Sequence, residues 1–176
     1  MKLHIGCGKR YFKGWTNLDV NTGIADMIDD AAKLTKIADD SCELVYAAHV
    51  LEHFGREETL SVLKVWYKKL KPGGILRLSV PDFAKVVLIY QKGWDLDSRL
   101  LGYVTGGQRD QYDVHKMIFD QKNLTRLLKE AGFKTVRLWD WRKTEHTQYD
   151  DYSQAYLPHM DKEKGTMMSL NIEGVK

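Results

Sequence analysis

Leu3-His4-Ile5-Gly6-Cys7-Gly8, close to the start of the chain, is a short apolar run followed directly by two glycines around a cysteine. The pattern predicts a buried strand that ends in a tight turn. In open α/β sheets, ligands bind at this place, beside the carboxyl ends of the strands. Glycine has no Cβ to keep a ligand away from the backbone, so Gly6 and Gly8 are candidate binding residues. A tight turn without a ligand is the alternative explanation.

Apolar runs and helical patterns alternate along the rest of the chain, which favours an α/β fold with a mostly parallel sheet. Pro72-Gly73-Gly74 is expected to stop the first helix, Asp120 to begin the last helix and Gly132 to end it. We expect irregular structure over residues 91–114. The predicted strands cover residues 3–5, 15–20, 24–28, 43–48, 75–80, 135–141 and 167–175, and the predicted helices cover residues 57–70, 83–90 and the segment from Asp120 to Gly132.

The composition is that of one globular domain over residues 1–176, with 43% hydrophobic and 29% charged residues. A net charge of +3 is too small to predict nucleic-acid binding. No apolar run approaches the roughly 18 residues that span a membrane, and the first residues carry no secretory signal. Cys7 and Cys42 cannot form a disulfide framework. We therefore expect a cytoplasmic protein with neither nucleic acid nor membrane as partner, whose sheet begins without a helix before it.

Asp19 ends the second predicted strand, where a carboxylate can accept hydrogen bonds from both hydroxyls of a ribose. The spacing differs from the dinucleotide fingerprint, because Tyr11 stands where its third glycine would be. Asp19 also follows Gly6 more closely than the roughly 20 residues of that fingerprint. These residues favour an adenosine ligand other than NAD. A surface aspartate beside a tight turn is the alternative.

His49-Val50-Leu51-Glu52-His53 matches the H-x-x-E-H pattern of inverted zincins. On a helix, both histidines would lie on one face, as a zinc site requires. A third protein ligand would have to come from a helix farther along the chain, and no segment presents an obvious one. A zinc hydrolase that uses His49, Glu52 and His53 is therefore kept as an alternative, and we expect no metal site.

A series of short motifs follows the glycine turn in a fixed order. Together they resemble the class I S-adenosylmethionine-dependent methyltransferases, in particular a small type 11-like group of predicted methyltransferases that begin with L-x-I-G-C-G. The resemblance implies a Rossmann-like methyltransferase fold with a seven-stranded, mostly parallel sheet, an antiparallel last strand and no N-terminal helices. It also implies S-adenosyl-L-methionine as cofactor. The matching stretches are residues 3–8, 14–19, 39–45, 49–54, 70–74, 78–82, 106–108, 115–116, 127–133 and 169–173.

The resemblance also implies which residues hold the cofactor. Gly6, Cys7 and Gly8 would lie against its methionine and ribose, and Asp19 would bind the ribose hydroxyls. Further along the chain, the pair Asp30-Ala31 would hold the adenine, with Asp29 as an alternative to Asp30, and His49 would line the methionine part. A loop acid on the surface is the alternative explanation for Asp30.

His53, Asp82 and His115 are the candidate catalytic residues, because an oxygen nucleophile near neutral pH needs a general base. His53 could instead hydrogen bond a nearby backbone group, and Asp82 could cap the next helix. The stretch 84–114 is expected to cover the substrate, with its glycines as bending points. Tyr90, Trp94, Tyr103, Gln108, Arg109 and Tyr112 are the candidate lining residues.

The sequence thus supports a methyltransferase that acts on a small-molecule or glycan-type acceptor. A non-catalytic, cofactor-binding regulatory or structural subunit is the first alternative, and the zinc hydrolase is the second. The acceptor and the oligomeric state stay open, with a homodimer as one candidate.

Overall fold

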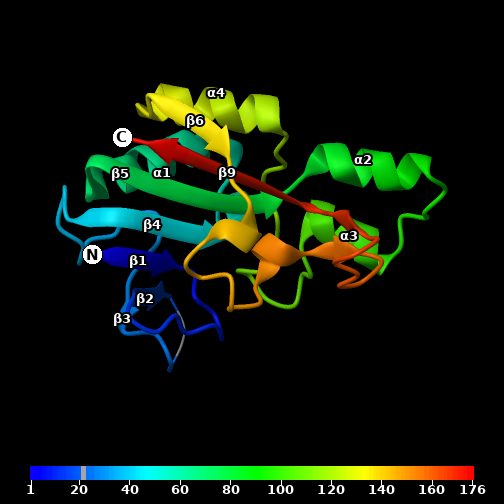
Figure 1. Cartoon of the computed structure of the whole chain (residues 1–176), viewed down its shortest axis with the longest axis horizontal. Helices are drawn as coiled ribbons and strands as arrows, with labels where there is room; N and C mark the ends of the chain where they lie inside the picture. Colours follow the sequence, from blue (N-terminus) through cyan, green and yellow to red (C-terminus); the bar gives the residue numbers. More distant parts are fainter. Residues whose placement is uncertain (21–22) are drawn as a thin grey trace.

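The computed structural model describes residues 1–20 and 23–176, and its centre is a seven-stranded sheet. The strand order is β3-β2-β1-β4-β5-β9-β6 (Figure 1). Neighbouring strands from β3 through β5 are parallel, whereas β9 is antiparallel to β5 and β6, between which it lies. The expected fold class is confirmed. The strands are β1 (Lys2–Ile5), β2 (Thr16–Asp19), β3 (Met27–Ile28), β4 (Cys42–Ala48), β5 (Leu70–Pro81), β6 (Thr135–Leu138) and β9 (Ser169–Val175).

Two helices cover one face of the sheet. Successive residues of a strand point to opposite faces, so Leu3 and Ile5 of β1 join the main apolar core while His4 points away from it. The helix α1 (Arg56–Lys69) and the helix α4 (Gln121–Ala131) pack on this core (Figure 1). Asp120 caps α4 by accepting from the Asn123 N–H, as predicted.

The first helix ends earlier than predicted. α1 stops at Lys69, and β5 begins at Leu70, so Pro72-Gly73-Gly74 lies inside the strand rather than between helix and strand. Cys42 of β4 pairs with Leu70 of β5, and the next pair is Leu44 with Ile75. The register therefore shifts at the start of β5, and residues 71–74 have no partner in β4. An irregular start tolerates proline and glycine that a regular inner strand would not.

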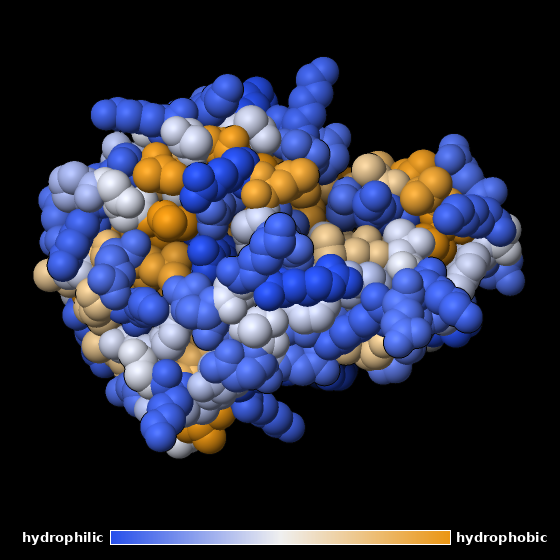
Figure 2. Space-filling model, viewed as in Figure 1, coloured by the Kyte–Doolittle hydropathy of each residue, from blue (hydrophilic) through white to orange (hydrophobic). Residues whose placement is uncertain are grey.

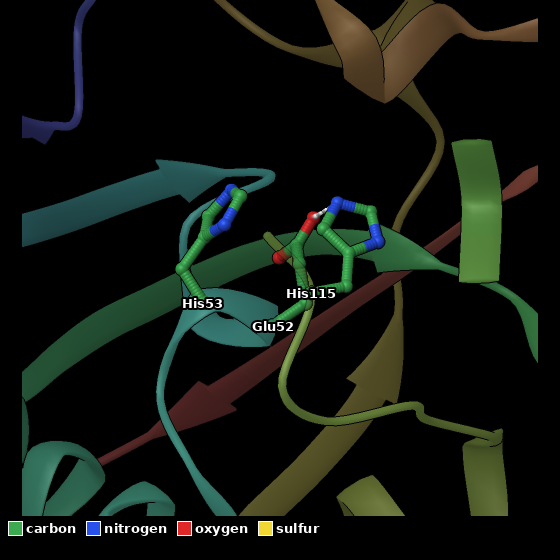
Figure 3. A group of neighbouring side chains, drawn as sticks. All are labelled: Glu52, His53 and His115. Atoms are coloured by element: carbon green, nitrogen blue, oxygen red, sulfur yellow. Dashed lines mark ion pairs between the residues drawn. The ribbon is translucent and has the colours of Figure 1, made fainter. Parts of the chain in front are cut away.

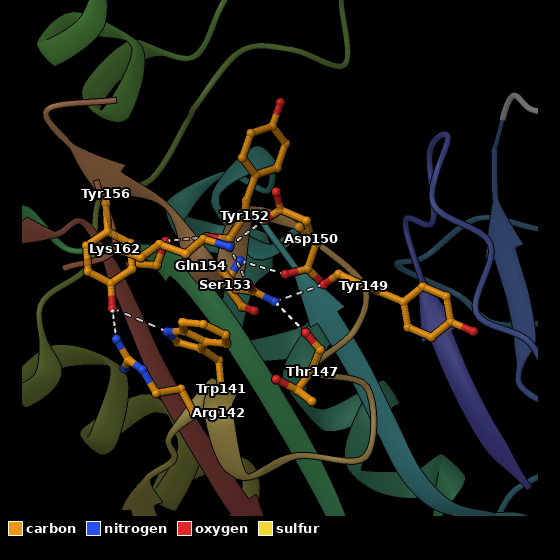
Figure 4. A network of polar contacts seen from close by, with 12 residues as sticks. Trp141, Arg142, Thr147, Tyr149, Asp150, Tyr152, Ser153, Gln154, Tyr156 and Lys162 are labelled. Atoms are coloured by element: carbon orange, nitrogen blue, oxygen red, sulfur yellow. Dashed lines mark hydrogen bonds and ion pairs between the residues drawn. The ribbon is translucent and has the colours of Figure 1, made fainter. Parts of the chain in front are cut away.

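Aromatic rings and an irregular segment cover the opposite face. Phe12 stacks on His4 with ring centroids 4.0 Å apart, and His146 lies 4.4 Å from Tyr46. The segment 139–157, which includes η2 (Trp141–Lys143) and η3 (Tyr152–Gln154), holds His146 over the sheet. Figure 4 shows how polar contacts brace this segment, for example between the Gln154 side chain and two backbone carbonyls. The prediction of a strand through Trp141 was wrong, since β6 ends at Leu138.

A second, smaller layer lies beyond the carboxyl end of β5 (Figure 1). It contains α2 (Phe83–Gln91), α3 (Ser98–Thr105) and the hairpin of β7 (Tyr156–Leu157) with β8 (Thr166–Met167). The expectation of irregular structure over 91–114 was wrong, because α3 forms within it. Asp97 caps α3 by accepting from two backbone N–H groups. The layer has its own apolar cluster, made of Val86, Ile89, Leu100, Leu157 and Met168.

On the face of the molecule drawn in Figure 2, hydrophilic residues cover most of the surface and apolar residues gather in a few places. One of these places is α2, where Phe83, Val87, Leu88 and Tyr90 are exposed. Of the helices in residues 1–20 and 23–176, none is long and apolar enough to cross a membrane.

Candidate active site

Two cavities meet at the carboxyl edge of the parallel strands. We call the cavity of about 410 Å³ cavity A and the cavity of about 270 Å³ cavity B. Both are lined by His49 and His53, so these two side chains form the boundary between them. Cavity A is further lined by Gly6, Leu18, Asp19, Val20, Asp30, Ala31, Ala32, Val50, Phe54, Glu58, Gln111, Tyr112 and Lys116. Cavity B is further lined by Arg99, Gly102, Tyr103, Gly107, Arg109, Asp113, His115 and Tyr152.

The glycine turn after β1 borders cavity A at Gly6. Gly6 has φ +66°, a conformation that L side chains rarely adopt, and an added Cβ would collide with Val50 Cγ2. Cys7 is buried, and burial raises the pKa of its thiol to about 11, so it is a neutral thiol. The Cys7 N–H donates to the Leu18 carbonyl. Cys7 and Gly8 thus shape the turn without lining the cavity themselves.

Asp19 lies at the end of β2, on the wall of cavity A. Its Oδ2 accepts a hydrogen bond of 2.8 Å from the Gly8 N–H, which ties the carboxylate to the glycine turn. A carboxylate has acceptor sites for several donors.

The turn around Asp30 and Ala31 forms the far wall of cavity A. Trp66 of α1 is buried and donates to the Ala31 carbonyl at 2.7 Å, which fixes the turn against the core. Asp30 Oδ1 accepts from the Ala32 N–H. Asp29, the alternative to Asp30, uses its carboxylate for the Asp30 and Lys36 N–H groups and the Thr35 hydroxyl. Asp30 rather than Asp29 lines the cavity.

His49 follows β4 in a strained conformation, with φ +54°. Non-glycine residues in this region are uncommon and gather at functional sites. The Ser169 hydroxyl donates to the Tyr152 carbonyl at 2.6 Å, so it accepts from His49 Nε2 at 3.0 Å. His49 Nδ1 then faces Glu52 Oε1 at 3.3 Å. Burial lowers the pKa of His49 to about 3, so its ring is neutral.

Glu52 precedes His53 in the chain, lines neither cavity and is fully buried. Both carboxylate oxygens lack a hydrogen-bond partner within the described part of the chain, because the contact with His49 is off the line of a hydrogen bond. Burial raises the pKa of Glu52 to about 8. Its backbone carbonyl accepts from the N–H groups of both Lys116 and Met117, which brings His115 to its side.

His53 and His115 stand on either side of Glu52 (Figure 3). His53 Nδ1 lies 3.0 Å from the Val114 carbonyl, and His115 Nδ1 lies 3.3 Å from the Tyr103 carbonyl. A carbonyl can only accept, so each Nδ1 carries the hydrogen and each Nε2 keeps a free lone pair when the ring is neutral. Burial lowers the pKa of His115, the nearby His53 adding to this effect.

Asp82 has a different place. It is the N-cap of α2, where its Oδ1 accepts from the Ala84 N–H at 3.0 Å, and it lines neither cavity. Burial raises the pKa of its carboxyl group. The capping alternative from the sequence describes its contacts.

The structure brings most of the sequence-predicted residues together: Gly6, Asp19, Asp30, Ala31, His49 and His53 in cavity A, and His115 with Tyr103 and Arg109 in cavity B. Sequence reasoning missed Tyr152, which reaches cavity B from a segment with no periodic pattern. It assigned Tyr90, Trp94 and Gln108 to the pocket, but these residues line neither cavity.

The helix required by the inverted-zincin pattern is not formed. The residues from Leu51 to His53 form the short 3-10 helix η1, and His49 precedes it in the left-handed conformation. His49 and His53 therefore do not share a face of one helix, and His49 Nε2 is held by Ser169. His115 lies beside Glu52 and His53, but this group of three leaves out His49, so it is not the ligand set of the inverted-zincin pattern.

Comparison with known proteins gives the following matches. A family model described as a methyltransferase domain matches residues 5–138. Similar solved structures include an S-adenosylmethionine-dependent methyltransferase from Archaeoglobus fulgidus, with a TM-score of 0.62, 18% identity, and coverage of 99% of this chain and 85% of that chain. Another, from Mesorhizobium loti, has a TM-score of 0.59, 18% identity, and coverage of 99% and 90%. At such identities the structural likeness shows the fold. Comparison with curated protein sequences gave no significant match.

Proposed function

Because the chain belongs to the class I S-adenosylmethionine-dependent methyltransferases, with S-adenosylmethionine as cofactor, we propose that it methylates a small polar acceptor bound in cavity B. One observation carries the proposal: cavities A and B meet at His49 and His53. A cofactor in cavity A would present its methyl group at this boundary, and an acceptor in cavity B would meet it there.

In this proposal, different residues around cavity A bind different parts of the cofactor. Asp19 binds the ribose hydroxyls, which donate to its carboxylate. The turn of Asp30 and Ala31 holds the adenine, and Gly6 lets the methionine part approach the backbone. His49 lines the path toward the methyl group. The support for this arrangement is that all five residues line one cavity at the carboxyl edge of the sheet.

The methyl group of a sulfonium is already electrophilic, so the main task of the protein is to hold the nucleophile in line with the S–CH₃ bond. Such orientation supplies about 7–11 kcal/mol of the barrier. His53 and His115 each keep a lone pair on Nε2, since their Nδ1–H groups donate to backbone carbonyls. Either ring can therefore accept a proton from a hydroxyl acceptor.

The stretch 84–114 covers the acceptor in this proposal. Support comes from α3 and the loop after it, because Arg99, Tyr103 and Arg109 line cavity B and Tyr112 lines cavity A. Gly106 ends α3 with φ +77°, and its position leaves no room for a Cβ beside the Asp113 carbonyl. A volume of about 270 Å³ favours a small molecule or a single sugar unit over a long glycan.

Calorimetry with S-adenosylhomocysteine tests the first half of the proposal. We expect binding by the wild-type protein and at least a tenfold loss of affinity in Asp19→Ala, because the ribose hydroxyls lose a charged acceptor worth about 1.5–3 kcal/mol. Asp39→Ala is the matched control, since Asp39 is exposed and pairs only with Lys69 among the contacts described for it. No binding by the wild type would refute the proposal.

A methyl-transfer assay over a panel of small hydroxylated acceptors and sugars tests the second half. Turnover of any of them supports an enzyme. Binding of S-adenosylhomocysteine with no turnover across the panel would favour the non-catalytic cofactor-binding subunit instead.

Two further expectations belong to this proposal. Cys7 and Cys42 are buried free thiols, which suits a reducing, cytoplasmic compartment.

The exposed apolar side chains of Phe83, Val87 and Tyr90 on α2 offer a face for a homodimer. Light scattering after gel filtration measures the oligomeric state.

A further inference from the structure

The carboxylate of Glu52 is the most unusual polar group in the described residues. It is 0% exposed, and neither oxygen has a hydrogen-bond partner there. A buried carboxylate without partners is destabilising, and structures tolerate one where a ligand or ion completes its contacts. The carboxyl group lies between His53, which lines both cavities, and His115, which lines cavity B (Figure 3). Glu52 is thus placed to bind something that this chain does not itself supply.

The two histidine rings beside Glu52 are oriented as metal ligands usually are. A metal-bound histidine nearly always donates its other ring N–H to a carbonyl or carboxylate, which fixes the tautomer and the ring orientation. His53 does so to Val114 and His115 to Tyr103. In both rings, Nε2 is left with its lone pair, and His115 Nε2 lies 3.9 Å from Glu52 Oε1.

The donor set fits a divalent transition-metal ion. One donor atom from each of Glu52, His53 and His115 can be chosen so that all lie within 4.8 Å of one another. Donors around a zinc ion, bound at about 2.0–2.2 Å, lie roughly 3.3–3.6 Å apart, so the side chains would rotate toward one another when the ion binds. We propose that Glu52, His53 and His115 bind a divalent transition-metal ion of the Zn²⁺ type at the boundary of the two cavities.

The two-histidine, one-carboxylate set also explains which ions fit. Imidazole nitrogens suit Zn²⁺ and its neighbours in the first transition row, whereas Mg²⁺ and Ca²⁺ prefer oxygen ligands. Three protein ligands leave at least one coordination position open, as in catalytic zinc sites. His49 is not part of the set, because the group of mutually close donor atoms consists of Glu52, His53 and His115.

The role of the ion rests on the proposed methyl transfer. Bound to the open position, an acceptor hydroxyl would lose its proton to water more readily, as metal-bound water does. The oxygen would then form a bond with the methyl carbon while the C–S bond of the sulfonium breaks. The products are the methyl ether, S-adenosylhomocysteine and one proton. The inference therefore assigns cavity B an acceptor with a hydroxyl that can reach the ion.

The test uses the full chain after treatment with a chelator and dialysis. Titration with ZnCl₂ in a calorimeter should show one equivalent bound, and saturating Zn²⁺ should raise Tm by several degrees. Glu52→Gln keeps the shape but cannot ionise to a carboxylate, so this variant and His115→Gln should each lower the affinity at least tenfold and abolish the rise in Tm. MgCl₂ in the same titration should bind at least tenfold more weakly than ZnCl₂.

His159→Gln is the matched control, because His159 is exposed and lies far along the chain from the cluster. It should bind Zn²⁺ as the wild type does. If the wild type binds no Zn²⁺, or if binding survives both Glu52→Gln and His115→Gln, the metal site is refuted. S-adenosylhomocysteine is titrated separately, so its binding without Zn²⁺ binding would refute this inference alone, and Zn²⁺ binding without cofactor binding would refute the methyltransferase proposal instead.

Discussion

Two groups of histidines lie on different parts of the sheet and differ in what surrounds them. His4 and His146 are buried among aromatic rings on the face opposite the helices, where His4 Nδ1 pairs with Asn17 Oδ1 at 3.1 Å. His53 and His115 stand at the carboxyl edge beside a carboxylate without hydrogen-bond partners. The first group is held by contacts that complete a core. In the second group, each Nδ1 lies near a backbone carbonyl and both rings border cavity B.

The comparison shows that the residue type alone does not indicate a role. All four rings are partly or fully withdrawn from water, and burial lowers the pKa of His4, His115 and His146 alike. What separates the groups is what lies beside the rings: aromatic side chains for His4 and His146, and a carboxylate without hydrogen-bond partners for His53 and His115. Substitution should therefore damage stability in the first group and activity in the second.

The largest effect is expected for His115→Gln. Its methyl-transfer rate should fall by about 10²–10⁴, the range for losing a positioned acid–base or metal-binding group. The free energy of unfolding should change by less than about 1 kcal/mol, since among the described residues the ring makes one long hydrogen bond, to the Tyr103 carbonyl, and lies 3.9 Å from Glu52 Oε1. Rates with an acceptor from the panel and urea unfolding measure the two quantities. A large loss of stability with an unchanged rate would show that His115 has a structural role instead of a functional one.

The next effect concerns pH and the ring of His146. Burial lowers its folded pKa to about 4, below the ordinary value of 6.5. Between these values the unfolded chain binds a proton that the folded chain does not, so stability falls as the pH drops from 6.5 toward 4. From pH 7 to pH 5, this residue should cost about 2 kcal/mol of the free energy of unfolding.

His146→Phe keeps an aromatic ring against Tyr46 and removes the titration. Urea unfolding at pH 7 and pH 5 should therefore show a flatter dependence in the variant than in the wild type. The affinity for S-adenosylhomocysteine at pH 7 should stay the same, because His146 lines neither cavity. An equal change in the free energy of unfolding between pH 7 and pH 5 in the two proteins would contradict the lowered pKa of His146.

Much of this arrangement could be predicted from the sequence. The carboxyl ends of parallel strands meet at one edge, so Gly6 after β1, Asp19 at the end of β2 and His49 after β4 were expected to meet, and they line one cavity. The turn of Asp30 and Ala31 followed from the motif resemblance. Their place in the fold could be predicted because each residue sits next to a strand with an apolar pattern, whereas their roles toward the cofactor stay predictions.

The partners across the chain could not be predicted in the same way. His115 reaches Glu52 because the Lys116 and Met117 N–H groups donate to the Glu52 carbonyl, and backbone bonds leave no trace in the pattern of side chains. The helix α3 was missed because Gly102 and the β-branched Val104 and Thr105 weaken its helical pattern. Tyr152 comes from a segment held by single polar contacts, such as that of Ser169 with its carbonyl.

The smallest effect is expected for Tyr46→Phe, within the aromatic group. The Tyr46 hydroxyl donates to Asp151 Oδ2 at 2.6 Å in a buried place, and this bond joins β4 to the segment 139–157. Its loss should lower the free energy of unfolding by about 1–2 kcal/mol, because Asp151 keeps only its bond from the Ser153 N–H among those described.

Tyr90→Phe is the matched control, since Tyr90 is 54% exposed on α2 and should change stability by less than about 0.5 kcal/mol. Tyr46→Phe should bind S-adenosylhomocysteine as tightly as the wild type, measured by calorimetry at pH 7. Suppose the variant instead lost affinity for S-adenosylhomocysteine while keeping its stability. The Tyr46–Asp151 bond would then influence the site through Tyr152, which follows Asp151 directly and lines cavity B. The division between a structural and a functional histidine group would then fail at that residue.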